Sequence, residues 1–526
     1  MLAVVASHAP LGMEGELVSV EVDIRTGLPG VDIVGLPDGA VRESKDRVRV
    51  AIRNSGFAFP QDRILVSLAP AAVRKEGASF DLPIALGILA ASGQIAPDGC
   101  GRAMVLGELS LEGAVRPVNG VLSAVGTGLE AGIETFLVPR ANLREAQALR
   151  KGRVAGITSL REAALMLSGD PLAEQSPAPP TTEEEAPGYA EEGAPEHDSI
   201  AGDLGDIRGL AETKRALEIA AAGRHHLLLF GPPGCGKTLS ALRLPSLLPR
   251  LSREEALVVT RIHSIAGVLP HDSGLVEQAP FRMPHHSASS VGILGGGRFV
   301  RPGEVSLAHN GVLFLDEAPE FGMTTLQGLR EPVEEGWVSI SRAGATVRYP
   351  ASLQLVLAFN PCPCGNLGRP GHACVCSLTE IQRYWRRVGG ALLDRIDIRV
   401  PVAPVPAAEM CRPADPREGP SARERVTAAV DRQRLRFAGL PFSRNSRIPA
   451  GLIDRFCPLD DECRAEMTRA TEKGYVSSRA FHSILRIART IADLDGAAGI
   501  SKVHLLEAVR HRRFGDGDFY WSRPGR

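Results

Sequence analysis

The segment GPPGCGKT has the residue types and the spacing of a phosphate-binding loop. Its glycines let successive backbone amides converge on phosphate oxygens, Lys237 can reach the terminal phosphates, and the Thr238 hydroxyl can bind Mg²⁺. A plain Gly/Pro turn is the weaker interpretation, because the chain has only seven lysines and one follows the apolar run LLLF at this spacing. The residues expected to hold the phosphates of a nucleotide are Gly231, Pro232, Pro233, Gly234, Cys235, Gly236, Lys237 and Thr238.

Two acids end the apolar run GVLFLDE, and an amide ends the run LQLVLAFN. Buried parallel strands bring such ends to one edge of a sheet, where Asp316 can hold Mg²⁺ and Glu317 can polarise an attacking water. Asn360 can orient the same water from the next strand. An acidic strand end is ordinary by itself, but together with the phosphate loop it predicts a nucleotide-hydrolysing site.

Four cysteines form two C-x-C pairs, CPC and CVC, separated by nine residues. Four thiolates that converge from two such pairs can close a tetrahedral structural zinc site directly after Asn360, and His372 is a possible substitute ligand. Four free cysteines are the alternative. The candidate zinc ligands are Cys362, Cys364, Cys374 and Cys376.

The elements that position these residues follow from the apolar pattern. Strand-like runs alternate with longer segments over residues 200–400, which predicts a parallel α/β core, and the pattern over 401–526 is helical. In the run SRAFHSILRIARTIADL, apolar residues recur at helical spacing and leave Arg479 and Arg486 together on another stripe. Strands interleaved with helices over 1–167 predict an α+β domain.

Residues 168–199 should be a linker, because the stretch has nine acidic residues and no lysine or arginine between Asp170 and Asp198. The net charge of the 526-residue chain is −1, but without those nine acids it carries 60 basic and 52 acidic residues, a balance that permits nucleic-acid binding. We expect a cytoplasmic protein with no membrane partner, since no signal peptide is evident and the longest apolar run, LPIALGILAA, is half a membrane span.

With these elements in order, the chain resembles the AAA+ ATPases, specifically the magnesium-chelatase-like YifB/ComM family, over nearly its full length. The resemblance implies a P-loop core with a helical C-terminal lid, and a homo-hexameric ring. It implies that Asn360 is the polar sensor and that Arg395 is an arginine finger facing the neighbouring subunit's nucleotide. Arg479 takes the second-sensor position against the γ-phosphate. The segments that carry the resemblance are PFRMPHHSAS, GEVSLAHNGVLFLDEAPEF, NPCPCG and LLDRIDI.

Both arginines also have plainer interpretations. Arg395 can form an intrachain pair with Asp394 or Asp397, and Arg479 can be a solvated helix-face residue. His285 and His286 in MPHHS can ligate a metal, although a structural role near the nucleotide is the better expectation.

Two further segments resemble the helix-2 insert and the pre-sensor hairpin of the chelatase and replicative-helicase branch of AAA+ ATPases, ILGGGRFVRPGE and WVSISRAGATVRYP. Cationic loops can follow a phosphate backbone without reading its sequence, so the resemblance implies DNA contact; solvated loops are the alternative. The candidate DNA contacts are Arg298, Arg301, Arg342 and Arg348.

The first 167 residues resemble the Lon-protease-like domain, which has the fold of ribosomal protein S5 domain 2. Ser79 stands where Lon has its nucleophile, but Leu122 and Ala124 occupy the positions at which Lon has its lysine base. Since an unassisted hydroxyl is a poor nucleophile, we expect no Ser–Lys protease activity.

The resemblance implies an ATPase motor that translocates on branched or single-stranded DNA and promotes branch migration in recombination and natural transformation. One alternative is an ATPase subunit of a magnesium chelatase. The other is an ATP-switched scaffold that remodels proteins.

Overall fold

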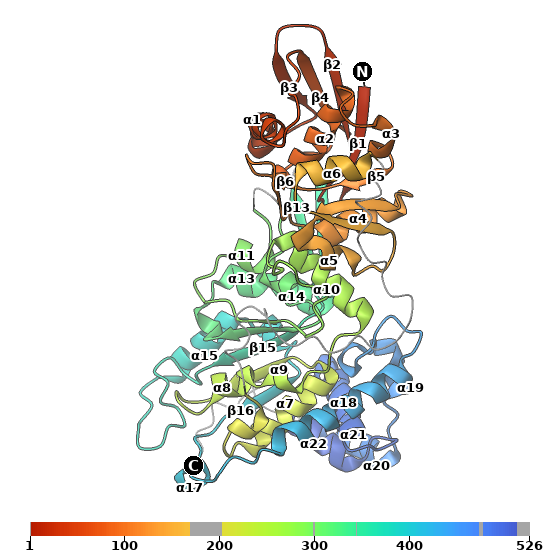
Figure 1. Cartoon of the computed structure of the whole chain (residues 1–526). Coiled ribbons are helices and arrows are strands. Elements are labelled where there is room, and N and C mark those ends of the chain that lie inside the picture. The colour runs from red at the N-terminus through yellow and green to blue at the C-terminus, as the bar shows by residue number, and fades with distance from the viewer. Residues whose placement is uncertain (1, 169–201, 298–299, 343–344, 473–476, 513–526) are drawn as a thin grey trace. The chain divides into compact units, whose positions relative to one another are not determined.

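The computed structural model describes residues 2–168, 202–297, 300–342, 345–472 and 477–512 (Figure 1). They form two compact units. Of the described residues, one unit contains 2–168, Arg253–Glu277 and 345–348, and the other contains 202–252, 278–297, 300–342, 349–472 and 477–512. Residues 169–199 of the predicted linker lie outside the described residues.

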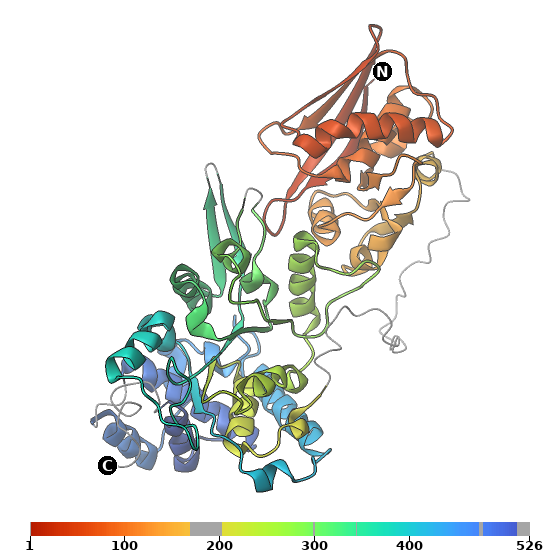
Figure 2. The same ribbon diagram turned by 90° about the vertical axis from the view of Figure 1, so that its left-hand side faces the viewer.

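The first unit is built on a seven-stranded sheet in the order β3-β4-β2-β1-β5-β8-β9. Strands β1, β2 and β4 pair antiparallel and the remaining pairs are parallel. Alternate residues of β2, including Val18, Val20 and Val22, share one core with α1 and α2, and α1 is seen against the sheet in Figure 2. The strands are β1 (Leu2–Ala9), β2 (Glu16–Arg25), β3 (Gly30–Val34), β4 (Arg63–Ala69), β5 (Ala103–Val105), β8 (Thr135–Pro139) and β9 (Arg153–Ile157). The main helices are α1 (Gly39–Asn54), α2 (Asp81–Ala91), α4 (Val121–Glu130), α5 (Leu143–Gln147) and α6 (Leu160–Leu167).

Helix α10 (Arg253–Ala266) also belongs to this unit, although its residues follow the phosphate loop in the chain. The Ser264 hydroxyl accepts a hydrogen bond from the Gly120 amide at 2.9 Å and donates to the Glu145 carboxylate. Burial raises the pKa of Glu145. Arg253 donates to the Ala148 carbonyl at 2.6 Å. The helix is thus fixed to α4 and α5 by a buried polar cluster.

The second unit contains a parallel five-stranded sheet in the order β11-β12-β15-β10-β16. Both faces are covered, because Leu227 and Leu229 of β10 pack in one core and Leu228 and Phe230 in another. This burial explains why the strands read as continuous apolar runs, and it confirms the predicted α/β core. The strands are β10 (Leu227–Phe230), β11 (Phe281–Arg282), β12 (Val312–Asp316), β15 (Gln354–Phe359) and β16 (Ile398–Pro401).

The C-terminal helices pack on this sheet through α21. Ser483 of α21 donates to Asp397 Oδ1 at 2.6 Å, and Thr490 Oγ1 lies 2.8 Å from Nε2 of His225, which precedes β10. Burial opposes ionisation of Asp397, yet hydrogen bonding to His225 and Ser483 and the charges of the two neighbouring histidines hold its pKa well below the usual range. The C-terminal helices are α18 (Glu418–Arg436), α20 (Asp461–Glu472), α21 (Ser478–Leu494) and α22 (Lys502–Arg512), and α7 (Ala211–Gly223) precedes β10.

The predicted hairpin is present as β13 (Trp337–Arg342) and β14 (Ala345–Pro350), and its turn lies outside the described residues (Figure 2). None of the described helices is both long and apolar enough to cross a bilayer.

Candidate nucleotide site

Three neighbouring strands end at the same edge of the five-stranded sheet. Phe230, the last residue of β10, is paired with Phe359, the last residue of β15. Asp316 ends β12 opposite Ala358. The phosphate loop, the two acids and Asn360 therefore leave the sheet at one edge, where open α/β sheets bind ligands.

Two glycines shape the phosphate loop. Gly236 has a φ of +93° and precedes α8 (Lys237–Leu242), a backbone conformation that side chains disfavour. A Cβ atom on Gly231 would lie 2.1 Å from the Val402 carbonyl oxygen, so only glycine fits there. The loop is held in the tight form that lets its amides face a phosphate at the helix N-terminus.

Lys237 lies folded over this loop. Its Nζ donates to the Gly231 carbonyl at 2.7 Å, to the Pro232 carbonyl at 3.0 Å and to Asn360 Oδ1 at 3.1 Å. Burial lowers the pKa of Lys237, with the nearby Cys235, Asp316 and Glu317 opposing the shift. The amine thus lies between the loop and the polar sensor predicted on the next strand.

The two residues expected to bind Mg²⁺ also lie together. Thr238 Oγ1 donates to Asp316 Oδ2 at 2.7 Å, so the hydroxyl and carboxylate expected to hold Mg²⁺ face each other. The Glu317 amide donates to Asp316 Oδ1 at 2.9 Å. Glu317 has a φ of +51°, an uncommon conformation outside glycine, and its side chain is 64% exposed with Oε2 3.7 Å from His286 Nδ1. The carboxylate that should polarise water is therefore accessible.

These residues surround a cavity of about 630 Å³. The predicted residues that line it are Pro233, Gly234, Lys237, Thr238, Asp316, Glu317 and Asn360. Gly231, Pro232, Cys235 and Gly236 shape the loop without lining the cavity, and Cys235 is buried. Sequence reasoning missed one wall of the cavity, formed by Glu320, Glu380, Arg383, Tyr384 and Arg387. The only signal for this wall was the i, i+4 spacing of two arginines after the capping sequence Ser377-x-x-Glu380.

Arg395 and Arg479 line a second cavity, of about 420 Å³, and not the first. Both donate to the Glu334 carboxylate, Arg395 through Nε at 3.0 Å. Arg395 is the main cause of the lowered pKa of Glu334. The intrachain partner of Arg395 is thus Glu334 and not Asp394 or Asp397. Arg479 lies 3.6 Å from Asp394 and does not meet the phosphate loop of its own chain, because α21 begins beside the second cavity.

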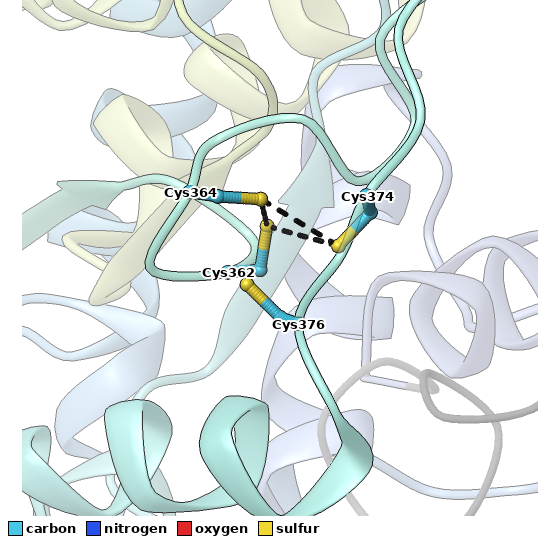
Figure 3. Close-up of side chains that lie close together, drawn as sticks. All are labelled: Cys362, Cys364, Cys374 and Cys376. Carbon is cyan, nitrogen blue, oxygen red and sulfur yellow. Dashed lines mark hydrogen bonds between the residues drawn. The ribbon is translucent and has the colours of Figure 1, made fainter.

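The four cysteines converge as their spacing predicted (Figure 3). Their Sγ atoms lie within 4.8 Å of one another, and three of the separations are 3.4, 3.6 and 3.7 Å. A tetrahedron of zinc–sulfur bonds about 2.3 Å long has edges of about 3.8 Å, so the cluster has the size of a zinc site. His372 Nδ1 donates to the Pro370 carbonyl at 3.2 Å, and His372 is not part of the cluster.

The remaining candidates are separate from these cavities. Arg301 and Arg348 are exposed, whereas Arg298 and the side chain of Arg342 lie outside the described residues. In the first unit Leu122 and Ala124 are buried on α4.

Comparison with known families decides the identity of the fold. A model described as "Magnesium chelatase, subunit ChlI" matches residues 203–410, "Subunit ChlI of Mg-chelatase" matches 20–142, and "Magnesium chelatase, subunit ChlI C-terminal" matches 418–512. YifB of Escherichia coli is 40% identical over 516 residues, and competence protein ComM of Haemophilus influenzae is 39% identical over 520 residues. Each alignment covers 97% of both chains.

The chain belongs to the YifB/ComM family of magnesium-chelatase-like AAA+ ATPases. An uncharacterized protein of Mycobacterium tuberculosis is 40% identical over 97% of this chain and 98% of its own length. A Lon protease of Chloroflexus aurantiacus is 30% identical over 142 residues, which are 26% of this chain and 17% of the protease. The YifB/ComM chain thus combines an AAA+ core and a helical C-terminal region with a preceding Lon-like domain. Membership of this family implies ATP and Mg²⁺ as cofactors.

Proposed function

We propose that this ATPase is a homo-hexameric ring that translocates on DNA and acts as a branch-migration helicase in recombination and natural transformation. The observation that carries the ring is the separation of Arg395 and Arg479 from their own phosphate loop. The support for DNA is the relative named competence protein ComM. In this proposal Arg301 and Arg348, with Arg298 and Arg342, contact the DNA backbone.

Each side chain has a defined part in hydrolysis. Lys237 and the loop amides bind the phosphates, Thr238 and Asp316 hold Mg²⁺, Glu317 takes the proton of the attacking water, and Asn360 orients that water. Bound Mg²⁺ supplies neutralisation of phosphate charge. Arg395 and Arg479 reach the γ-phosphate held by the neighbouring subunit, and Glu334 holds both guanidinium groups at one point before they do so.

The cysteine cluster holds a structural Zn²⁺ in this proposal. Cys362, Cys364, Cys374 and Cys376 are four thiol ligands of the type that closed structural zinc sites use, and their separations fit the metal. The cluster follows Asn360 directly, so the metal would fix the loop between the sensor and α15 (Leu378–Val388).

The decisive experiment offers the purified protein ATP and a labelled three- or four-stranded DNA junction. We expect ATP-dependent conversion of the junction, and none from Glu317→Gln, which keeps the nucleotide bound. An active ATPase that never converts a junction would overturn the helicase proposal. The second candidate is an ATPase subunit of a magnesium chelatase, favoured by the match of residues 203–410 to that family model. ATP-dependent stimulation of metal insertion into a porphyrin would identify it.

A further inference from the structure

Helix α15 forms a cationic wall of the nucleotide cavity that the hydrolysis scheme above does not use. Arg383 and Arg387 both line the cavity, together with Tyr384 between them. They are four residues apart, so they project from the same side of the helix, one turn from each other. Lys237 and Thr238 line the same cavity from the phosphate loop.

The position of α15 is fixed by the segment that follows the sensor. Trp385 Nε1 donates to the Pro361 carbonyl at 3.0 Å, and its ring packs 4.9 Å from that of Phe359. Ile381 and Val388 are buried in the same core. These contacts bury one face of α15 against the core of the sheet. Arg383 and Arg387 lie outside this buried face and line the cavity. A rotation of α15 that moved the two arginines out of the cavity would break these apolar contacts.

The start of the helix is equally fixed. The Ser377 side chain accepts from the Glu380 amide, and the Glu380 carboxylate accepts from the Ser377 amide at 2.7 Å and hydroxyl at 2.9 Å. This reciprocal capping uses Oε2 of Glu380, the acid nearest in sequence to Arg383. The hydrogen bonds from Ser377 and, to a smaller extent, the charge of Arg383 lower the pKa of Glu380. Cys376, the last ligand of the cysteine cluster, directly precedes the cap and also lines the cavity.

The two arginines are incompletely neutralised. Among the described residues, Arg383 has no carboxylate within salt-bridge distance, and Arg387 lies 3.6 Å from Glu320 Oε1. Glu320 belongs to the short helical turn Ala318–Glu320 that follows Glu317, so Arg387 contacts the segment that directly follows the proposed catalytic base. Guanidinium groups facing a cavity that also contains a phosphate loop suit a polyphosphate ligand.

We propose that Arg383 and Arg387 bind the terminal phosphate of the nucleotide held by their own subunit and make the site prefer a triphosphate to a diphosphate. This inference rests on the proposed nucleotide site. The loop amides hold the inner phosphates and Lys237 reaches the terminal ones. Helix α15 and Lys237 both line the cavity with Asn360, where the terminal phosphate must be when water attacks it. These arginines act within the subunit, in contrast to Arg395 and Arg479 in the second cavity.

The test is equilibrium binding of a non-hydrolysable ATP analogue and of ADP, both with Mg²⁺, to the full chain. For the variant Arg383→Ala/Arg387→Ala we expect at least a tenfold loss of analogue affinity and less than a twofold change for ADP. Arg386→Ala is the matched control, because Arg386 is exposed on the same helix and does not line the cavity. Arg387→Lys, which keeps the charge without the planar fork, should lose less than Arg387→Ala.

Two outcomes would overturn the inference: equal weakening of both nucleotides by the double variant, or no change in either. Thermal unfolding of each variant shows whether it is folded before binding is compared. Failure of the proposed nucleotide site would look different, since the unmodified protein would then bind neither nucleotide.

Discussion

Arg395 and Glu334 form an ion pair in which Nε lies 3.0 Å from Oε2, and the other carboxylate oxygen accepts from Arg479. One acid therefore holds two cations that come from distant parts of the chain. Arg395 follows α16 (Gly390–Leu393), Arg479 lies in the first turn of α21, and Glu334 lies in α14 (Arg330–Glu335). This pairing places both guanidinium groups together at the second cavity, which no residue of the phosphate loop lines.

We predict that Arg395→Ala lowers ATP hydrolysis by the assembled protein about a thousandfold and leaves nucleotide affinity within a few-fold, because a finger acts on the transition state. Mixing Arg395→Ala subunits with Glu317→Gln subunits should restore hydrolysis, since some interfaces then pair an intact Glu317 with an intact arginine. Arg434→Ala is the control, because Arg434 is half-buried and pairs with Asp431, three residues away on the same helix. A mixture as inactive as its two components would contradict action across an interface.

Metal analysis tests the cysteine cluster. We expect about one zinc per chain in the unmodified protein and much less in Cys362→Ser/Cys374→Ser, because two thiolates cannot replace four in a closed site. Cys411→Ser, an exposed cysteine outside the cluster, should keep the metal. Equally low zinc in all three proteins would show that the cysteine cluster does not bind zinc.

The pH dependence of stability follows from three buried histidines. Burial lowers the pKa of His8, His226 and His511 to about 4 from an ordinary value of 6.5. The unfolded chain therefore binds more protons than the folded chain between these values, and stability falls as the pH drops from about 6.5 to about 4. Each group contributes up to about 1.4 kcal/mol per pH unit in that window and nothing above it.

Urea unfolding of the full chain at a series of pH values measures this slope. His8→Gln keeps a donor for the Glu14 carbonyl that Nε2 contacts at 3.0 Å, and it should make the slope shallower. An unchanged slope would show that His8 does not stay neutral in the folded protein.

Much of the nucleotide site could be predicted because its residues are marked by strand ends. Lys237, Asp316 and Asn360 follow runs of apolar residues, and the parallel sheet necessarily brings those ends together. Their catalytic roles remain predictions. The cysteine cluster could also be predicted, because its four cysteines are close together in the sequence.

Other parts of the site depend on packing between distant segments, and local patterns do not carry that information. Glu334 lies in an ordinary amphipathic stretch, and only the fold brings it to Arg395 and Arg479. Arg383 and Arg387 resemble any charged helix face until Trp385 is seen to fix the rotation of α15.

The position of α10 determines how the protein can be divided. A single cut within residues 168–199 would not release two fragments that each fold alone. The C-terminal fragment would contain residues 253–277, which belong to the first unit. Val259 and Ile262, both fully covered in the intact chain, would then face water. Separate production of the ATPase unit requires replacing residues 253–277 with a short connector. The first unit should then be produced with residues 253–277 fused to it as a peptide.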